Sequence, residues 1–404
     1  MRSIGLVMVL AFTASSFCGC YKPARTSEAS YEFVRNFDKL GSEPTALFLS
    51  NDGFLYGTFK NGGKKWEGAV FKMRPDGTEL EVVHHFTGYS AREDGSWPVG
   101  LIEGSDGNLY GVSQQGGTPT GPLHVSGGGT VFRVGKDGSN YAVLHRFAGG
   151  VNGIEPWGGL AQGGDGILYG TTIEGGKHEG GTIFKLKNDG SNFAILHHFA
   201  GGDNDGARPM ADLTMGCDGV LYGTTDSGGN SGGRNGTVVR INTDGTGFKV
   251  LHHFPSGKDD GRMPRSRLIE AGDGALYGMT QSGGEQDAGT VFKIRKDGGG
   301  YRVLHRFNAD TDGMGPNGLA LRADGTLFGT TEHRGTHGHG TLFSLNAKRT
   351  GFAVLHHFGG NENEGINPAG KLLLTGEGTL LGMTLRSQPE NSAALFNVTF
   401  RDRE

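Results

Sequence analysis

The tetrapeptide Gly-x-x-Pro occurs seven times in this chain of 404 residues, and no other feature constrains the fold as strongly. The copies begin at Gly41, Gly95, Gly153, Gly206, Gly261, Gly313 and Gly365. Each copy opens a unit with the same later landmarks, and repetition at a period of roughly 50 residues is typical of propellers and solenoids. The 77 glycines would indicate disorder without a period, but most stand at fixed places in the unit and are expected in turns.

Each unit contains four short apolar stretches, which we expect to be strands and name a to d. Strand a follows the Pro, and an Asp-Gly pair such as Asp165-Gly166 leads to strand b, as in 168–172. A Gly-rich loop precedes strand c, as in 289–293, and a second Asp-Gly pair precedes strand d, as in 250–254. Gly permits positive φ and Asp can bond its own backbone, so each pair favours a hairpin turn. Four antiparallel strands in every unit predict propeller blades.

The two ends of the repeat region complete each other. The last unit stops at Glu404 without a strand d, whereas residues 31–37 match the strand d pattern. We therefore predict an all-β fold over residues 31–404: a seven-bladed β-propeller with four antiparallel strands per blade, closed by strand 31–37 in the last blade. Strand a is expected to line the channel and strand d to lie outermost. Closure of this kind removes free sheet edges.

The repeated units resemble a known family. Leu168-Tyr-Gly-Thr-Thr, Gly181-Thr-Ile-Phe-Lys and Leu196-His-His-Phe are similar to the GloVer tandem repeat, which occurs in exported bacterial proteins with varied surface-anchoring devices. The resemblance covers nearly all of 31–404. It implies export and anchoring, and it supplies no catalytic residues.

The N-terminus resembles an export signal. A positive start is followed by the apolar run 4–14, which is too short to span a bilayer, and then by Phe17-Cys18-Gly19-Cys20. A small residue before a cysteine resembles the bacterial lipoprotein signal. We expect a signal peptide at 1–19, a lipid on Cys20 as membrane anchor, and a tether at 20–30. The expected location is the outer membrane or cell surface, and the alternative is a periplasmic or secreted protein.

Composition excludes several classes of partner and site. The net charge of −4 gives no basic footprint for nucleic acid. Only Cys217 of the three cysteines remains after processing at Cys20, so we expect neither a disulfide nor a cysteine metal cluster. We expect a monomer.

Candidate ligand-binding residues stand where the units differ. The residues just after strand b break the repeat and should lie near the channel mouth: Lys60, Gln114, Glu174, Asp226, Gln281, Glu332 and Arg386. Trp66 and Trp97 are expected on or near the same face, where either ring could stack on a sugar or serve in packing. The alternative for the seven is a set of solvated loop ends.

No cofactor is required by the sequence, but a divalent metal has two candidate sites. His333, His337 and His339 stand close together in the sixth b–c loop and could hold Zn²⁺ or Cu²⁺ with Glu332. Asp205 and Asp312 stand in d–a loops with calcium-like spacing but without the rest of an EF-hand. The alternatives are a polar loop tip for the histidines and turns or blade-to-blade hydrogen bonds for the acids. Ten further histidines belong to strand d and are expected to pack or to hydrogen-bond.

Two functions remain open from the sequence. The first is a binding or scaffold module for an extracellular glycan, peptide or protein. The second is an extracellular lyase or hydrolase whose acid and base come from Glu174, Asp226, Glu332 or His333, with or without a metal. Convergence of these four side chains into one pocket would favour the enzyme.

Overall fold

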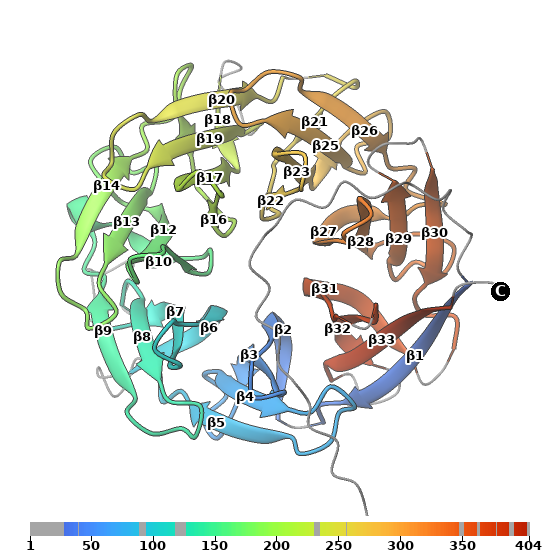
Figure 1. Ribbon diagram of the computed structural model, residues 1–404, viewed down its shortest axis with the longest axis horizontal. Coiled ribbons are helices and arrows are strands. Elements are labelled where there is room, and N and C mark those ends of the chain that lie inside the picture. Colours follow the sequence, from blue (N-terminus) through green and yellow to red (C-terminus); the bar gives the residue numbers. More distant parts are fainter. Residues whose placement is uncertain are drawn as a thin grey trace, which may run out of the picture.

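A computed structural model describes residues 28–38, 40–88, 94–117, 127–229, 235–255, 257–346, 351–361, 364–376, 378–387 and 392–401. These residues form the predicted seven-bladed propeller of antiparallel sheets (Figure 1). The only helical segment among them is the 3-10 turn η2 (Gly150–Asn152). No helix in these residues is both apolar enough and long enough to cross a membrane.

Blades 1 and 2 have four uninterrupted strands each, in the order a, b, c, d from the channel outward. Blade 1 consists of β2 (Gly41–Leu49), β3 (Leu55–Gly62), β4 (Ala69–Met73) and β5 (Glu81–His85). Blade 2 consists of β6 (Gly95–Glu103), β7 (Leu109–Gly116), β8 (Thr130–Val134) and β9 (Ala142–Arg146).

Blades 3, 4 and 5 differ because their strand a is interrupted. Blade 3 consists of β10 (Ile154–Pro156), β11 (Ala161–Gln162), β12 (Leu168–Glu174), β13 (Thr182–Leu186) and β14 (Ala194–His198). Blade 4 consists of β15 (Gly206–Ala207), β16 (Thr214–Met215), β17 (Val220–Thr225), β18 (Ser227–Gly228), β19 (Thr237–Asn242) and β20 (Lys249–His253). Blade 5 consists of β21 (Gly261–Arg262), β22 (Ile269–Glu270), β23 (Ala275–Thr280), β24 (Ser282–Gly283), β25 (Thr290–Arg295) and β26 (Arg302–Arg306).

Blades 6 and 7 return to a continuous strand a. Blade 6 consists of β27 (Met314–Leu321), β28 (Thr326–His333), β29 (Thr341–Asn346) and β30 (Phe352–His357). Blade 7 consists of β31 (Gly365–Leu374), β32 (Leu380–Ser387), β33 (Ala394–Arg401) and, as its outermost strand, β1 (Glu28–Asn36).

Ring closure by the N-terminal strand is confirmed. β1 pairs antiparallel with β33, with Tyr31 opposite Val398 and Phe33 opposite Phe396. The strand begins at Glu28 rather than at Tyr31, so residues 28–30 of the expected tether belong to it. The expected signal peptide 1–19 and Cys20 lie outside the described residues.

The Pro of the Gly-x-x-Pro motif lies within strand a in blades 1, 2, 3, 6 and 7, and between the two halves of the interrupted strand in blades 4 and 5. This corrects the expectation that strand a follows the Pro. β6 begins at Gly95, and Pro98 pairs with Ser113 three residues further on. Strand a is the inner edge of its sheet, so the missing N–H of Pro breaks no ladder bond. The residue before each Pro has positive φ: Glu43, Trp97, Glu155, Arg208, Met263, Gly315 and Asn367.

This left-handed residue ties neighbouring blades together. The N–H of Trp97 donates to the carbonyl of Glu67 in the preceding blade at 2.8 Å, and Arg208 donates to Gly180 in the same way. The Pro ring then packs on the Gly that opens the preceding strand c, where a Cβ on Gly68 would lie 2.2 Å from Pro98. The repeated tetrapeptide is therefore an interblade contact as well as a turn.

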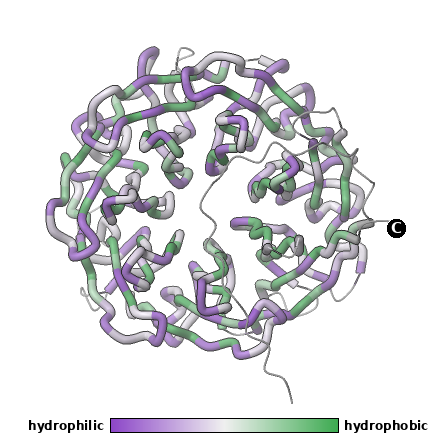
Figure 2. The backbone as a smooth tube through the Cα atoms, in the orientation of Figure 1, coloured by the Kyte–Doolittle hydropathy of each residue, from purple (hydrophilic) through white to green (hydrophobic). Residues whose placement is uncertain are grey.

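The hydrophobic core lies between neighbouring blades. One cluster joins Tyr222 and Val238 of blade 4 to Leu268 and Phe292 of blade 5, and all four side chains are almost fully buried. Figure 2 shows hydrophobic and hydrophilic stretches alternating along the chain in every blade. Each blade buries one face against the preceding blade and the other against the following blade. The same kind of hydrophobic contact therefore recurs around the ring and stabilises it.

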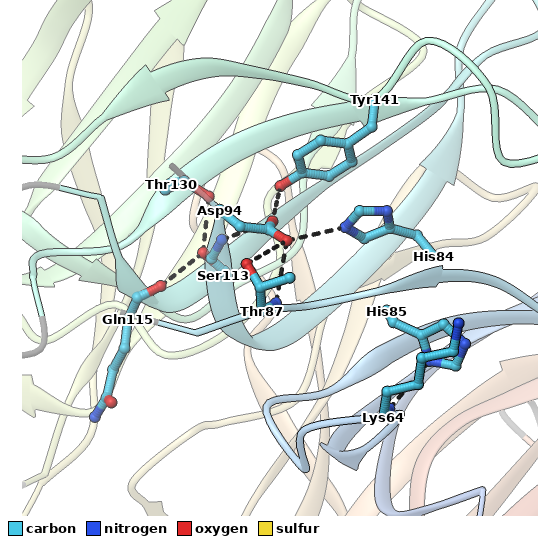
Figure 3. A network of polar contacts seen from close by, with 10 residues as sticks. Lys64, His84, His85, Thr87, Asp94, Ser113, Gln115, Thr130 and Tyr141 are labelled. Atoms are coloured by element: carbon cyan, nitrogen blue, oxygen red, sulfur yellow. Dashed lines mark hydrogen bonds and ion pairs between the residues drawn. The ribbon is translucent and has the colours of Figure 1, made fainter. Parts of the chain in front are cut away.

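Strand d histidines hold the outer rim, as predicted. His84 of blade 1 bonds through Nε2 to Asp94 at 3.3 Å and stacks on Tyr141 of blade 2, with ring centroids 3.9 Å apart (Figure 3). The Tyr141 hydroxyl donates to the same carboxylate. The other stacked pairs are His145–Phe193, His197–Phe248, His252–Tyr301, His305–Phe352 and His356–Tyr31. The second histidine accepts a backbone N–H in three of the four His-His pairs, as His85 does from Lys64 at 3.2 Å, whereas Nδ1 of His253 has no partner among the described residues.

Candidate functional site

The centre of the ring contains a cavity of about 810 Å³ lined mainly by the strands a and the segments beside them. This volume falls within the roughly 300–1,000 Å³ range of small-ligand sites. Its walls combine apolar side chains, such as Leu319 and Met210, with charged and amide side chains. We call the end of the channel that carries the b–c loops the b–c mouth.

The interruption of strand a in blades 3, 4 and 5 gives this cavity much of its polar lining. Residues 157–160, 208–213 and 263–268 leave the ladder between the two halves of each strand. Among them, Trp157, Asp212, Arg265 and Arg267 line the cavity. A continuous strand would direct alternate side chains into the neighbouring sheets.

Three charged residues, which we call the waist, meet across the channel: Asp212 of blade 4, Arg267 of blade 5 and Lys371 of blade 7. The Lys371 ammonium pairs with Asp212 from the far side of the ring, and the Gly159 N–H donates to Asp212 Oδ1 at 2.5 Å. The Asp212 side chain is 13% exposed and that of Lys371 is 29% exposed. Burial raises the pKa of Asp212, but Lys371 and Arg267 outweigh it and hold this pKa below its usual value.

The waist also borders a second cavity of about 690 Å³, towards the a–b turns of blades 1 and 2. Arg267 and Lys371 line both cavities. Charged groups at the waist are therefore within reach of a molecule in either part of the channel.

At the b–c mouth a cation lies between two tryptophans. The Lys60 ammonium is 4.7 Å from the ring centroid of Trp97 and 5.3 Å from that of Trp157. It is also 4.0 Å from the Glu43 carboxylate. Cation–π contacts of this kind orient the lysine and keep both aromatic faces close together.

Gln114 supplies an unsatisfied donor to the same mouth. Its side chain is 3% exposed and lines the cavity, and its Nε2 has no hydrogen-bond partner among the described residues. A buried amide without a partner costs about 1–3 kcal/mol. A ligand acceptor in the cavity would remove that cost.

The seven residues predicted from the ends of strands b are divided between two environments. Lys60, Gln114 and Gln281 line the cavity. Glu174 is held by Arg208 at 2.7 Å, and Asp226 is held by Arg265 at 2.6 Å. Within the described residues the cavity lining does not include Glu174, Asp226, Glu332 or Arg386. His333 is also outside this lining, so the four proposed acid–base groups do not converge on the part of the channel that the described residues form.

The predicted metal ligands are also separated in space. His333 lies near Glu332, with Nε2 at 3.4 Å from the carboxylate, and contacts Asn367 through Nδ1. His337 packs against His357, and a Cβ on Gly359 would touch the ring of His339. No group of three or more His, Cys, Asp or Glu side chains in the described residues could hold a metal ion.

The calcium-like loop acids bond to strand d histidines instead. Asp205 accepts from His197 at 3.1 Å, and Asp312 bonds to His305 at 3.0 Å. Because these carboxylates already bind imidazole rings and backbone N–H groups, their recurrence is explained by blade-to-blade bonding.

Sequence reasoning missed the waist and Trp157, although a signal was present. In blades 1, 2 and 6 two residues separate the motif Pro from the next Leu, as from Pro44 to Leu47. In blades 3, 4, 5 and 7 three residues do, as from Pro209 to Leu213. The residue before that Leu is Gly159, Asp212, Arg267 or Lys371. A comparison of these spacings would have indicated where the inner wall departs from the repeat.

The fold and the channel define a seven-bladed β-propeller with a ligand-sized central cavity. The model of the Gloeobacter/Verrucomicrobia repeat matches residues 19–233 and 203–396, and the chain belongs to this family. No curated protein shows significant similarity to the sequence.

Solved structures of other propellers are similar in fold. Oligogalacturonate lyase from Vibrio parahaemolyticus has a TM-score of 0.58 at 10% identity, covering 93% of this chain and 98% of that one. An oligogalacturonate lyase in complex with manganese has a TM-score of 0.56 at 10% identity, with coverage of 94% and 98%. A putative 6-phosphogluconolactonase from Bacteroides uniformis has a TM-score of 0.53 at 18% identity, with coverage of 81% and 88%. At these identities the likeness concerns the fold alone.

Proposed function

We propose that this chain is an exported binding module whose ligand is a glycan held at the b–c mouth of the channel. The observation that carries the proposal is Lys60 between Trp97 and Trp157, in a cavity that the unpartnered amide of Gln114 also lines. Aromatic faces stack on the apolar faces of sugar rings, and amides and ammonium groups bond the hydroxyls. The cavity volume also suits a short oligosaccharide better than a folded protein partner.

Binding is favoured over lyase or hydrolase chemistry by the position of the acidic side chains. A general acid and a general base must both lie within hydrogen-bond distance of the reacting atoms of the substrate. Among the described residues, Glu174 and Asp226 are outside the cavity lining, and they pair with Arg208 and Arg265 instead. Several propellers of similar fold are enzymes by name, so activity on sugars remains the alternative.

The module is proposed to be held at the cell envelope by a lipid on Cys20, with the propeller as a monomer at the end of a short tether. Replacement of Cys20 by Ser should move the protein from the membrane fraction to the soluble fraction. Membrane retention of the Cys20→Ser protein would contradict a lipid anchor at this residue.

Tryptophan fluorescence gives a direct binding test, because the chain has three tryptophans, Trp66, Trp97 and Trp157. Titration with a panel of oligosaccharides should change the emission of the wild-type protein. Trp157→Ala should weaken binding about tenfold or more, as expected for a central aromatic contact.

Trp66→Ala is the matched control. The Trp66 side chain is 58% exposed and is outside the cavity lining among the described residues. Its replacement should leave affinity unchanged while lowering total emission. Equal losses of affinity in both variants would move the site out of the channel and contradict the proposal.

A further inference from the structure

We infer that the glycan is acidic, and that Arg267 at the waist binds its carboxylate. This inference rests on the proposed function and adds the chemical class of the ligand. Its basis is a local excess of positive charge deep in the channel of a chain whose net charge is −4.

Most charged residues of the cavity lining already have partners. Arg265 is held by Asp226 at 2.6 Å, and Lys60 lies near Glu43. Glu270 binds Lys296 at 2.5 Å and accepts the Cys217 N–H at 2.9 Å. These pairs leave no strong charge at the mouth or at the opposite end of the channel.

The waist is different because it holds two cations and only one carboxylate. Asp212 pairs with Lys371, while no hydrogen bond joins Arg267 to another described residue. Arg267 is exposed to the channel although the residues beside it, Ser266 and Leu268, are buried. A guanidinium group that is exposed and has its donors free of protein acceptors can form two parallel hydrogen bonds with a carboxylate.

The surroundings strengthen such an interaction. The low-dielectric protein walls of the channel focus the field of its charges, so an anion at the waist is screened less than one at the outer surface. Because Arg267 and Lys371 line both cavities, a carboxylate there can belong to a ligand whose neutral part fills the channel towards Trp157.

Asp212 occupies the place that a ligand carboxylate would share. It pairs with Lys371 and feels the charge of Arg267, so it would compete with an incoming anion for both cations. Its Oδ1 is fixed by the Gly159 N–H, so it cannot turn away without losing that bond. Removal of its charge should therefore strengthen the binding of an acidic ligand, which is the opposite sign to the loss of Arg267.

The test compares two ligands that differ only in charge: a trimer of galacturonic acid and the same trimer fully methyl-esterified. Calorimetric titration of the wild-type protein should give at least about tenfold tighter binding of the acid, the value of one charge-assisted contact. Arg267→Gln should abolish this preference, and Asp212→Asn should raise affinity for the acid about threefold or more without a similar gain for the ester.

Arg295→Gln is the control, because Arg295 lies in the same blade, pairs with Asp297 and is 62% exposed. It should bind both trimers as the wild type does, and unfolding midpoints should show that every variant is folded. Equal affinity for the two trimers in the wild type would overturn the inference and leave the glycan proposal standing. Failure of both trimers to bind would overturn both proposals.

Discussion

The outer rim of this propeller is built from contacts that repeat from blade to blade, whereas the inner wall is built from residues that differ between blades. At the rim, six of the seven junctions between described strands use the same stack of a histidine on an aromatic ring. At the inner wall, strand a differs between blades in length, continuity and charge. The comparison teaches that the repeated residues hold the ring together, while the residues that differ between units supply the polar and charged side chains of the channel.

The closing junction, between blade 7 and blade 1, lacks this stack of a histidine on an aromatic ring. Arg35 of β1 takes the place of the histidine and Leu80 that of the aromatic ring. Arg35 donates through Nη1 to the Gly77 carbonyl at 2.6 Å, and Val34 and Leu80 pack on the adjoining core cluster. The junction formed by the two chain ends is thus built from different contacts, although the strand register is preserved.

The largest expected effect comes from removal of a rim carboxylate. Asp260 accepts from His252 at 3.2 Å, from the Gly261 N–H at 2.7 Å and from the Tyr301 hydroxyl, and it is 12% exposed. Asp260→Ala should lower the free energy of unfolding by about 3 kcal/mol, since it leaves buried donors without an acceptor. Denaturant unfolding measures this loss.

Asp297→Ala is the matched control in the same blade, because Asp297 is 67% exposed and bonds only the Gly299 N–H and the exposed Arg295 side chain. Its replacement should cost less than about 1 kcal/mol. If the two variants lost the same stability, the rim carboxylate would have no special structural role.

A second prediction concerns the junction of blades 2 and 3, where Asn152 replaces the rim acid. His145 stacks on Phe193, its Nε2 has no partner among the described residues, and burial lowers its pKa to about 4. A histidine with a lowered pKa stabilises the fold above pH 6.5, and this contribution is lost as the pH falls towards 4. Acidification to pH 5 should therefore cost about 1–2 kcal/mol at this junction.

Asn152→Asp sharpens the comparison, because His145 and residue 152 have the same spacing as His305 and Asp312. The new carboxylate should raise the pKa of His145, so unfolding at pH 5 should show a gain over the wild type of about 1–2 kcal/mol. At pH 8 the gain should be smaller. An equal change at both pH values would show that the variant acts through something other than His145.

The smallest expected effect is at the inner wall. Lys371→Met breaks the pair with Asp212, but the channel is open to solvent and Arg267 remains beside the carboxylate. The loss in unfolding free energy should be about 1 kcal/mol or less. A loss as large as that of Asp260→Ala would break the distinction between rim and wall, because the waist would then also hold the ring together.

The sequence predicted the architecture closely, because the same residue pattern recurs in every unit and each copy indicates the same contacts. Asp-Gly pairs predicted the turns, and the Asp52 carboxylate does bond the Phe54 N–H and the Tyr56 hydroxyl. The missing last strand predicted β1 as the closing strand. The strand d histidines were expected to be structural, and their bonds to Asp94, Asp205 and Asp312 confirm it.

The candidate site was predicted only in part. Lys60, Gln114 and Gln281 do line the channel, but Glu174 and Asp226 turn to arginines of the following blade. Which way a side chain turns at the end of strand b depends on its neighbour in the next blade, and a repeat pattern does not give that pairing. The cross-channel contact of Asp212 with Lys371 joins blades far apart in the sequence.

The sequence by itself determined the number of blades, the closure of the ring and the contacts that recur at every junction, because each is encoded by local spacing within the unit. Only the tertiary structure decided which residues meet in the channel. Asp212, Arg267 and Lys371 come from three separate units, and their encounter depends on the diameter of the closed ring and on where each strand a leaves its ladder. Local spacing determines the ring and its junctions, whereas the shape of the whole ring determines the site.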